Sequence, residues 1–288
     1  MNLPDSRRVS VVVILLLLLF TAASPRLCAV QVVPDPPPVD STLVILPAPV
    51  DSMSAQFLMQ EGDEFAERLF DNQRALAKYL DALTVEPNSE EIFWRISRCY
   101  VDIAEHLPSV TQNDRNYQLA TYERAQEFAS KAIAADPTSS MGYARRAIAT
   151  ARISMFSGVW EASDLIQNAY EDAQRAVELD PLNSMAQYVL GRVHARTSER
   201  PWVFRIVLGL GWADADEAIT HYERAVSLRP DFITYRIACA QLYFEEDEYD
   251  KAKAHLLAIE SLPTLDEDDD RFRKEAKDLL EKIREDEE

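Results

Sequence analysis

The chain has 288 residues, of which 49 are acidic and 30 are basic, and its formal net charge at pH 7 is −19. A surface of this charge repels the phosphate backbone, which excludes nucleic acid as an expected partner. Only six glycines are present and 47% of the residues are apolar. This composition leaves little room for turn-rich sheets and favours a helical protein.

Residues 1–28 have the features of an export signal. Arg7 and Arg8 precede an unbroken apolar run from Val11 to Phe20, and small residues follow this run. The run is short for a membrane span, which needs about 20 residues. The pattern predicts an exported protein that is periplasmic or associated with the cell envelope. The alternative is that the segment stays uncleaved and anchors the chain in a membrane.

Residues 29–52 are rich in proline among small and apolar residues. Proline fixes the backbone in an extended form and cannot continue a helix. We therefore expect a linker here, which separates the N-terminal segment from the rest of the chain.

Residues 53–288 contain a repeated helical pattern. A proline closes each copy, and small or bulky residues precede it at constant offsets on one helix face. The four clearest copies are Ala75, Tyr79, Ala82 and Pro87; Ala125, Ala129, Ala132 and Pro137; Ala169, Ala173, Ala176 and Pro181; and Ala218, Tyr222, Ala225 and Pro230. Small residues let a neighbouring helix approach closely, and the proline ends the helix. A fifth pair of helices begins after Pro230, so the pattern is typical of tetratricopeptide repeats.

The predicted fold is all-α, a right-handed α-solenoid of about five tetratricopeptide-like helix pairs. The closing prolines lie further apart than the standard repeat of about 34 residues. Insertions are therefore expected between the two helices of a pair, or as extensions of them. Residues 271–288 have one apolar stripe on an otherwise charged helix and are expected to cap the solenoid. We interpret the acidic run Asp266–Asp270 as favourable charge at the start of this helix, not as a cation site.

No catalytic constellation is apparent in the sequence. The four histidines are scattered, and His194 falls at a repeat position that an aromatic residue normally occupies for packing. Cys99 and Cys239 resemble small buried residues, and no pair has the spacing of metal ligands. We therefore predict a protein that is not an enzyme and has no cofactor and no metal site.

The first helix of each pair is expected to line a concave groove, with residues one turn apart pointing into it. The residues at these positions are Trp94 and Arg98, Ala144 and Ile148, Tyr188 and Arg192, and Ile237 and Gln241. Two of the four helices thus present an aromatic residue with an arginine, a combination that binds carboxylate or phosphate groups beside apolar area. The alternative is that Arg98 and Arg192 form ion pairs with nearby acids.

The insertion from Pro201 to Trp212 is unusually apolar and includes Trp202 and Trp212. A segment of this kind is buried, covers a groove or meets an apolar partner. Burial as an additional core helix is one expectation. If the insertion instead covers the concave face, it would enclose an apolar cavity bordered by arginines and suited to an amphipathic ligand.

Three segments resemble the regulator of microtubule dynamics family: Phe93–Arg98, Asn168–Pro181 and Arg200–Ile206, the last followed by Ala218–Phe232. The resemblance covers roughly residues 70–280. It implies a helical repeat protein, because family members are helical repeat proteins associated with microtubules or with the mitochondrial outer membrane. One branch binds and transfers phospholipid, which implies a similar groove. The predicted export signal departs from the cytosolic exposure of the family and favours an exported bacterial relative.

These observations predict a binding or scaffold protein that holds a peptide or partner protein in its concave groove. The candidate ligand-binding residues are Trp94, Arg98, Tyr188, Arg192, Trp202 and Trp212. The first alternative is a protein that binds or transfers phospholipid or another amphipathic ligand. The second alternative, for a eukaryotic chain, is a membrane-anchored regulator associated with microtubules. Contact with a membrane is expected only through the N-terminus or a peripheral partner.

Overall fold

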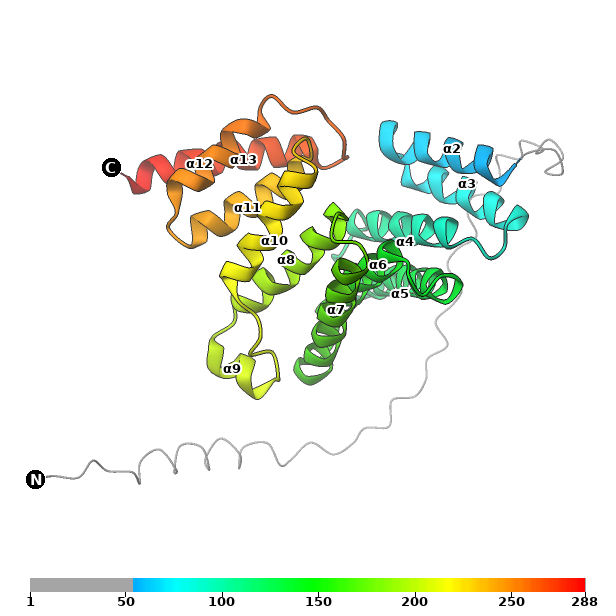
Figure 1. Cartoon of the computed structure of the whole chain (residues 1–288), viewed down its shortest axis with the longest axis horizontal. Coiled ribbons are helices and arrows are strands. Elements are labelled where there is room, and N and C mark those ends of the chain that lie inside the picture. The colour runs from blue at the N-terminus through cyan, green and yellow to red at the C-terminus, as the bar shows by residue number, and fades with distance from the viewer. Residues whose placement is uncertain (1–53, 288) are drawn as a thin grey trace, which may run out of the picture. The chain divides into compact units, whose positions relative to one another are not determined.

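The computed structural model describes residues 54–287, and helices make up most of this range (Figure 1). The sequence predictions for residues 1–28 and 29–52 lie outside the described part. The helices are α2 (Ala55–Asp63), with a π-helical extension (Glu64–Arg68), α3 (Asn72–Val85), α4 (Glu90–Glu105), α5 (Gln112–Ala135), α6 (Ser140–Ile153), a short 3-10 turn (Ser154–Phe156), α7 (Val159–Leu179), α8 (Ser184–Ser198), α9 (Trp202–Val207), α10 (Ala215–Leu228), α11 (Ile233–Glu245), α12 (Tyr249–Ile259) and α13 (Asp269–Asp286).

The helices form the five pairs that the sequence predicts. The second helices of the first four pairs end two residues before their prolines, at Val85, Ala135, Leu179 and Leu228. Side chains that accept hydrogen bonds from the backbone begin many of the helices, and these N-caps are Ser54, Asp71, Ser89, Thr111, Ser139, Asn183 and Asp214. The pairs are α2 and α3, α4 and α5, α6 and α7, α8 and α10, and α11 and α12.

Small residues lie where the helices cross. The alanines of the repeat pattern, such as Ala125, Ala169 and Ala218, are completely buried. Gly191 of α8 faces α10 so closely that a β-carbon at this position would lie 2.8 Å from the ring of Tyr222. Only glycine permits this approach, so the interface between α8 and α10 depends on it.

The predicted insertions occur inside the pairs. In the second and third pairs they lengthen the second helix, since α5 has 24 residues and α7 has 21 whereas α3 has 14. In the fourth pair the insertion forms the short helix α9 between α8 and α10. Each insertion therefore lies at the end of a pair opposite its closing proline.

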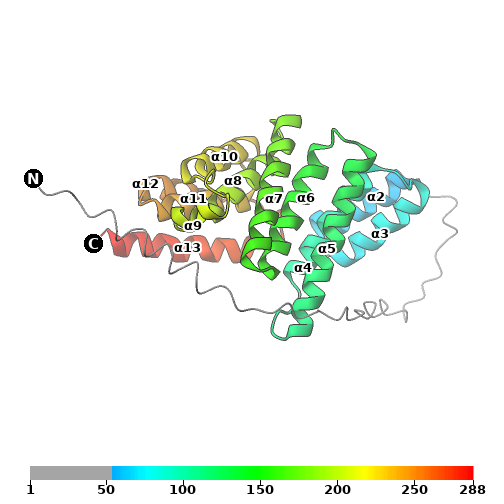
Figure 2. The same ribbon diagram turned by 90° about the horizontal axis from the view of Figure 1, so that it is seen from below.

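The C-terminal helix α13 packs on α11 and α12 (Figure 2). Its buried residues include Ala276, Leu279 and Ile283, on one face, whereas most of the remaining surface is charged, as the sequence predicts for a cap. The acidic run Asp266–Asp270 extends into this helix and places Asp269 and Asp270 in its first turn, where negative charge is favourable. The carboxylate of Asp269, which is completely buried, also fixes the preceding loop, because it accepts hydrogen bonds from the backbone of Leu265 (2.7 Å) and of Asp266 (3.0 Å). Across residues 54–287, no helix combines the length and the apolar character needed to cross a membrane.

Candidate functional site

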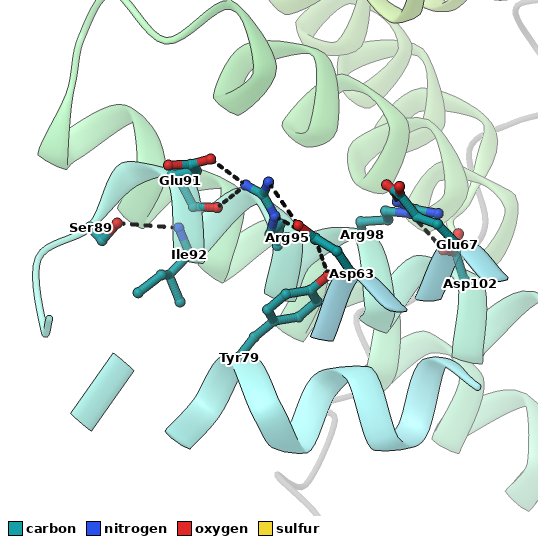
Figure 3. A network of polar contacts seen from close by, with 9 residues as sticks. All are labelled: Asp63, Glu67, Tyr79, Ser89, Glu91, Ile92, Arg95, Arg98 and Asp102. Atoms are coloured by element: carbon teal, nitrogen blue, oxygen red, sulfur yellow. Dashed lines mark hydrogen bonds and ion pairs between the residues drawn. The ribbon is translucent and has the colours of Figure 1, made fainter. Parts of the chain in front are cut away.

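Arginines on three successive first helices form the centre of the candidate site. We call this surface the arginine face and define it by Arg98 and Asp102 of α4, Arg145 of α6 and Arg192 of α8. Arg98, on the turn after Trp94, donates to Glu67 Oε1 (3.0 Å), and its Nε lies 3.4 Å from Asp102 Oδ2 (Figure 3). The structure thus gives Arg98 the ion pairs that the sequence offered as an alternative to ligand binding.

Next to Arg98, a second polar network joins the first two pairs of helices around Asp63. Tyr79 donates its hydroxyl to Asp63 (2.6 Å), and Arg95 donates to Asp63 (2.8 Å) and to Glu91 (2.9 Å) (Figure 3). The guanidinium of Arg95 also lies over the Trp94 ring, 4.3 Å from its centroid. Trp94 therefore packs against a charged group and is half-buried.

Arg145 lies deepest in the arginine face, with 7% of its surface exposed. Its Nε has no hydrogen-bond partner among the described residues. Burial lowers the pKa of this guanidinium to about 10 and raises the pKa of Asp102 to about 6, although Arg98 and Arg145 act to lower the pKa of Asp102. A buried cation that lacks part of its hydrogen bonding costs free energy. An acidic ligand that binds next to it would reduce this cost.

Arg192 forms its hydrogen bond with a tyrosine and not with a carboxylate. Its Nη1 donates to the hydroxyl of Tyr188 at 2.6 Å, one turn earlier on α8. The interaction with Tyr188 raises the pKa of Arg192. Tyr188 itself is buried and stacks on Tyr235, with ring centroids 5.0 Å apart. The predicted pair of Tyr188 and Arg192 is thus in contact, with the ring committed to the core.

A loop from the far end of the chain reaches the same region. We call residues 263–268, between α12 and α13, the acidic loop. Glu267 accepts a hydrogen bond from Asn72 of α3 (3.1 Å), and its Oε1 lies 3.3 Å from Nδ1 of His106, just after α4. Asp268 lies 3.8 Å from the other ring nitrogen of His106. The segment after the fifth pair of helices thereby contacts the first two pairs.

Two carboxyl groups of the acidic loop, those of Asp266 and Glu267, have raised pKa values. Burial raises the pKa of Glu267 to about 7 and also raises the pKa of Asp266, which the charge of Arg98 opposes. The backbone carbonyl of Asp102 accepts from the His106 ring (2.8 Å) and is the largest cause of its raised pKa. Carboxyl groups of the chain itself thus lie beside the arginine face.

An open hollow of about 430 Å³ lies between α8, α11 and α13. It contains Gln241, which the sequence predicts to face the groove, and Arg196, one turn after Arg192. Its lining combines charged residues of both signs with apolar ones and consists of Arg196, Gln241, Phe244, Glu245, Glu275, Asp278, Leu279 and Lys282. A hollow with charges of both signs suits a peptide better than an acyl chain.

The insertion divides into an anchored part and an exposed part. Trp212 stacks on Tyr170 of α7 with centroids 3.8 Å apart and donates to Gln167 (2.7 Å), whereas Trp202 on α9 is 66% exposed. Trp212 also meets the edge of His194, which is buried as the sequence predicts. The expectations that the insertion forms a core helix or covers the groove are both wrong for α9, because its apolar side chains are exposed.

Several residues of the site were not singled out from the sequence. The groove positions predicted on α6 were Ala144 and Ile148. Ala144 is completely buried, and its neighbour Arg145 lies in the arginine face instead. His106 and Glu267 are distant in sequence and meet only because the repeats curve.

A cluster of potential metal ligands was also missed. Glu223, Cys239 and His255, from α10, α11 and α12, each have a ligand atom within 4.8 Å of the others. No spacing rule connects three residues on three helices. The Nε2 atom of His255 lies 3.1 Å from Glu223 Oε1, so a hydrogen bond accounts for their contact.

Comparison with known proteins agrees with this architecture. The family model for "Regulator of microtubule dynamics protein 1-3" matches residues 58–284. Regulator of microtubule dynamics protein 1 from Bos taurus is 24% identical over 242 residues, which cover 80% of this chain and 74% of that protein. Protein 3 from Rattus norvegicus is 23% identical over 237 residues, and the match spans 78% of this chain but only 48% of that protein.

Among solved structures, TTC0263, a thermophilic TPR protein from Thermus thermophilus, has a TM-score of 0.58 and 19% sequence identity. The alignment covers 79% of this chain and 99% of that one. At this identity the likeness establishes the helical repeat fold alone.

Proposed function

Since the chain belongs to the family of regulator of microtubule dynamics proteins 1 to 3, whose fold here is a tetratricopeptide-like solenoid, we propose that it is a non-enzymatic scaffold. In this proposal the arginine face and the adjoining hollow bind an acidic, extended segment of a partner protein. Helical repeats are suited to this role because they expose a long surface on successive helices.

The observation that carries the proposal is the position of the acidic loop. This irregular segment contains Asp266, Glu267 and Asp268. The carboxylate of Glu267 contacts His106 and Asn72, and the charge of Arg98 acts on the pKa of Asp266. The chain thus already holds an acidic, non-helical segment of its own on His106 and Asn72, within reach of the charge of Arg98. A partner segment of similar chemistry would meet the same donors.

Arg145 strengthens the case for an acidic ligand. Its buried Nε lacks a partner among the described residues, and the carboxyl group that acts on its charge, Asp102, is shared with Arg98. A second carboxylate would add charge-assisted hydrogen bonds in a region of low dielectric, where they are strong. The charged residues of both signs that line the neighbouring hollow favour this ligand over phospholipid, the alternative drawn from the sequence.

The test uses a labelled peptide with the sequence of residues 261–270, Ser-Leu-Pro-Thr-Leu-Asp-Glu-Asp-Asp-Asp. The control peptide has Asn and Gln in place of Asp and Glu. Binding to the full chain is measured by fluorescence anisotropy. We expect only the acidic peptide to bind, and weakly, because the tethered loop competes at an effective concentration in the millimolar range.

Two variants and one control sharpen this experiment. Glu267→Ala loosens the loop and should tighten peptide binding several-fold, whereas Arg192→Ala should weaken it about tenfold. Arg175→Ala removes an exposed arginine on the outer helix α7 and should leave binding unchanged. Equal binding of both peptides, or no binding to the Glu267→Ala chain, would refute the proposal.

A further inference from the structure

The helix α9 exposes apolar side chains on every side. Its exposed residues are Trp202 (66%), Val203 (55%), Phe204 (63%), Ile206 (58%) and Val207 (64%). A helix that docks in a protein groove presents one stripe, with residues three and four apart, and keeps polar residues on the other face. The only polar residue of α9 is Arg205. A helix that is apolar all round is better suited to an apolar medium than to one side of a protein groove.

A second exposed apolar turn lies at the same end of the helices. Met155 (68%), Val159 (63%) and Trp160 (67%) surround the start of α7. The start of α7 lies beside the end of α8, because a short turn joins these antiparallel helices, and α9 follows α8 directly. Both views place α9 close to one end of α7 (Figures 1 and 2). We call the eight residues together the apolar tip.

The backbone of the α9 segment forms most of its hydrogen bonds internally, which suits an environment without water. In and after α9 the amides of Phe204, Leu208, Gly209 and Leu210 all donate to carbonyls within the segment. The guanidinium of Arg205 turns back to donate to the carbonyl of Ala213. A segment that enters lipid must satisfy its backbone groups internally, and this one does so to a large extent.

Charge also separates this segment from the rest of the surface. Residues 200–213 contain two arginines and no acidic residue, in a chain with 49 acidic residues. No carboxylate would therefore have to leave water with α9. Tryptophan, which the tip contributes from both turns, is the residue enriched at the interface between lipid and water.

We propose that the apolar tip inserts into the interfacial region of a lipid bilayer and holds the scaffold at a membrane surface. The anchored part of the insertion makes this a rigid contact. Leu210 is completely buried and Trp212 stacks on Tyr170, so α9 is fixed to α7. This contact lies in the described helices and adds to the membrane contact through the N-terminus or a peripheral partner that the sequence predicts.

The test is flotation of the full chain with phosphatidylcholine vesicles. Phe204→Glu places a charge in the tip, while Leu257→Glu makes the same change at a site on α12 that is equally exposed, at 64%. We expect the wild-type and Leu257→Glu chains to float and the bound fraction of Phe204→Glu to fall at least about tenfold. Both positions are exposed, so both variants should fold, which circular dichroism checks.

Tryptophan fluorescence localises the contact. Vesicles with brominated acyl chains should quench the wild-type chain, and Trp202→Phe should lose part of this quenching. Failure of the wild-type chain to float, or equal flotation of Phe204→Glu, overturns the proposal. Concentration-dependent self-association that Phe204→Glu abolishes, without vesicle binding, would assign the tip to a second copy of the chain and also overturn it.

Discussion

The arginine face and the apolar tip reverse the usual distribution of residues. On the arginine face, charged side chains such as Arg98 and Arg145 are mostly covered, and Arg98 is paired within the chain. On the tip, large apolar side chains such as Trp202 and Phe204 are exposed. The arginine face carries a cost in desolvation and the apolar tip a cost in solubility, and such costs are expected at functional surfaces.

The largest expected effect on stability is the difference between substitutions of the two tryptophans of the insertion, Trp212 and Trp202. Trp212→Ala removes the stack on Tyr170 and the hydrogen bond to Gln167, and should lower the free energy of unfolding by about 3 kcal/mol. Trp202→Ala should change it by less than about 0.5 kcal/mol, because that side chain is exposed. Urea unfolding measures both. Similar losses would mean that α9 is packed in solution and would remove the basis of the apolar tip.

A somewhat smaller effect should come from the arginine face. Arg98→Ala removes the cation that pairs with Asp102 and breaks the link to Glu67. Because the site is partly shielded from water, we expect the free energy of unfolding to fall by about 2 kcal/mol. The outer variant Arg175→Ala removes an exposed ion pair and should cost less than about 0.5 kcal/mol. Equal effects of the two variants would show that the face is open to solvent.

The smallest expected effect is a dependence of folding stability on pH, which arises from the acidic loop. An acid whose pKa is raised on folding binds its proton more tightly in the folded state, so the folded state loses stability as pH rises through that value. Glu267, with a pKa of about 7, acts in this sense, and so does His106, whose pKa is also raised. His194 and His221 act in the opposite sense, because burial lowers their pKa values.

Comparison with Glu267→Gln isolates the contribution of the acidic loop. The two chains should have similar stability at about pH 4, below the ordinary pKa of a glutamate, where Glu267 is largely protonated in both the folded and the unfolded chain. At about pH 8 the wild-type chain should be less stable than Glu267→Gln by on the order of 1 kcal/mol, after allowance for screening by solvent. Thermal unfolding at both pH values measures this. A constant difference across the range would place Glu267 in water, away from the arginine face.

The repeat architecture could be predicted because it depends on local rules. Alanines at helix spacing and prolines at helix ends, such as Ala125 and Pro137, fix where each helix packs and stops. The assignment of α13 as a cap followed from its single apolar stripe in the same way.

The site could be predicted only in part. The contact of Arg192 with Tyr188 lies within one helix and follows from its spacing, but the approach of Glu267 to Asn72 depends on the accumulated curvature of five pairs. Apolar composition alone could not reveal that Leu210 is buried while Ile206 is exposed. That difference arises from a turn at Gly209, whose φ of 74° suits glycine.

Native mass spectrometry of the purified full chain tests the central claim most directly. The spectrum would be recorded first for the chain alone and then with the acidic peptide of residues 261–270, using the Glu267→Ala variant as the more sensitive form. We predict the mass of the chain alone, followed by a peptide adduct of one-to-one stoichiometry that the amide control peptide does not form. A co-purified lipid at one-to-one stoichiometry that the peptide fails to displace would contradict the account and identify the protein as a lipid carrier.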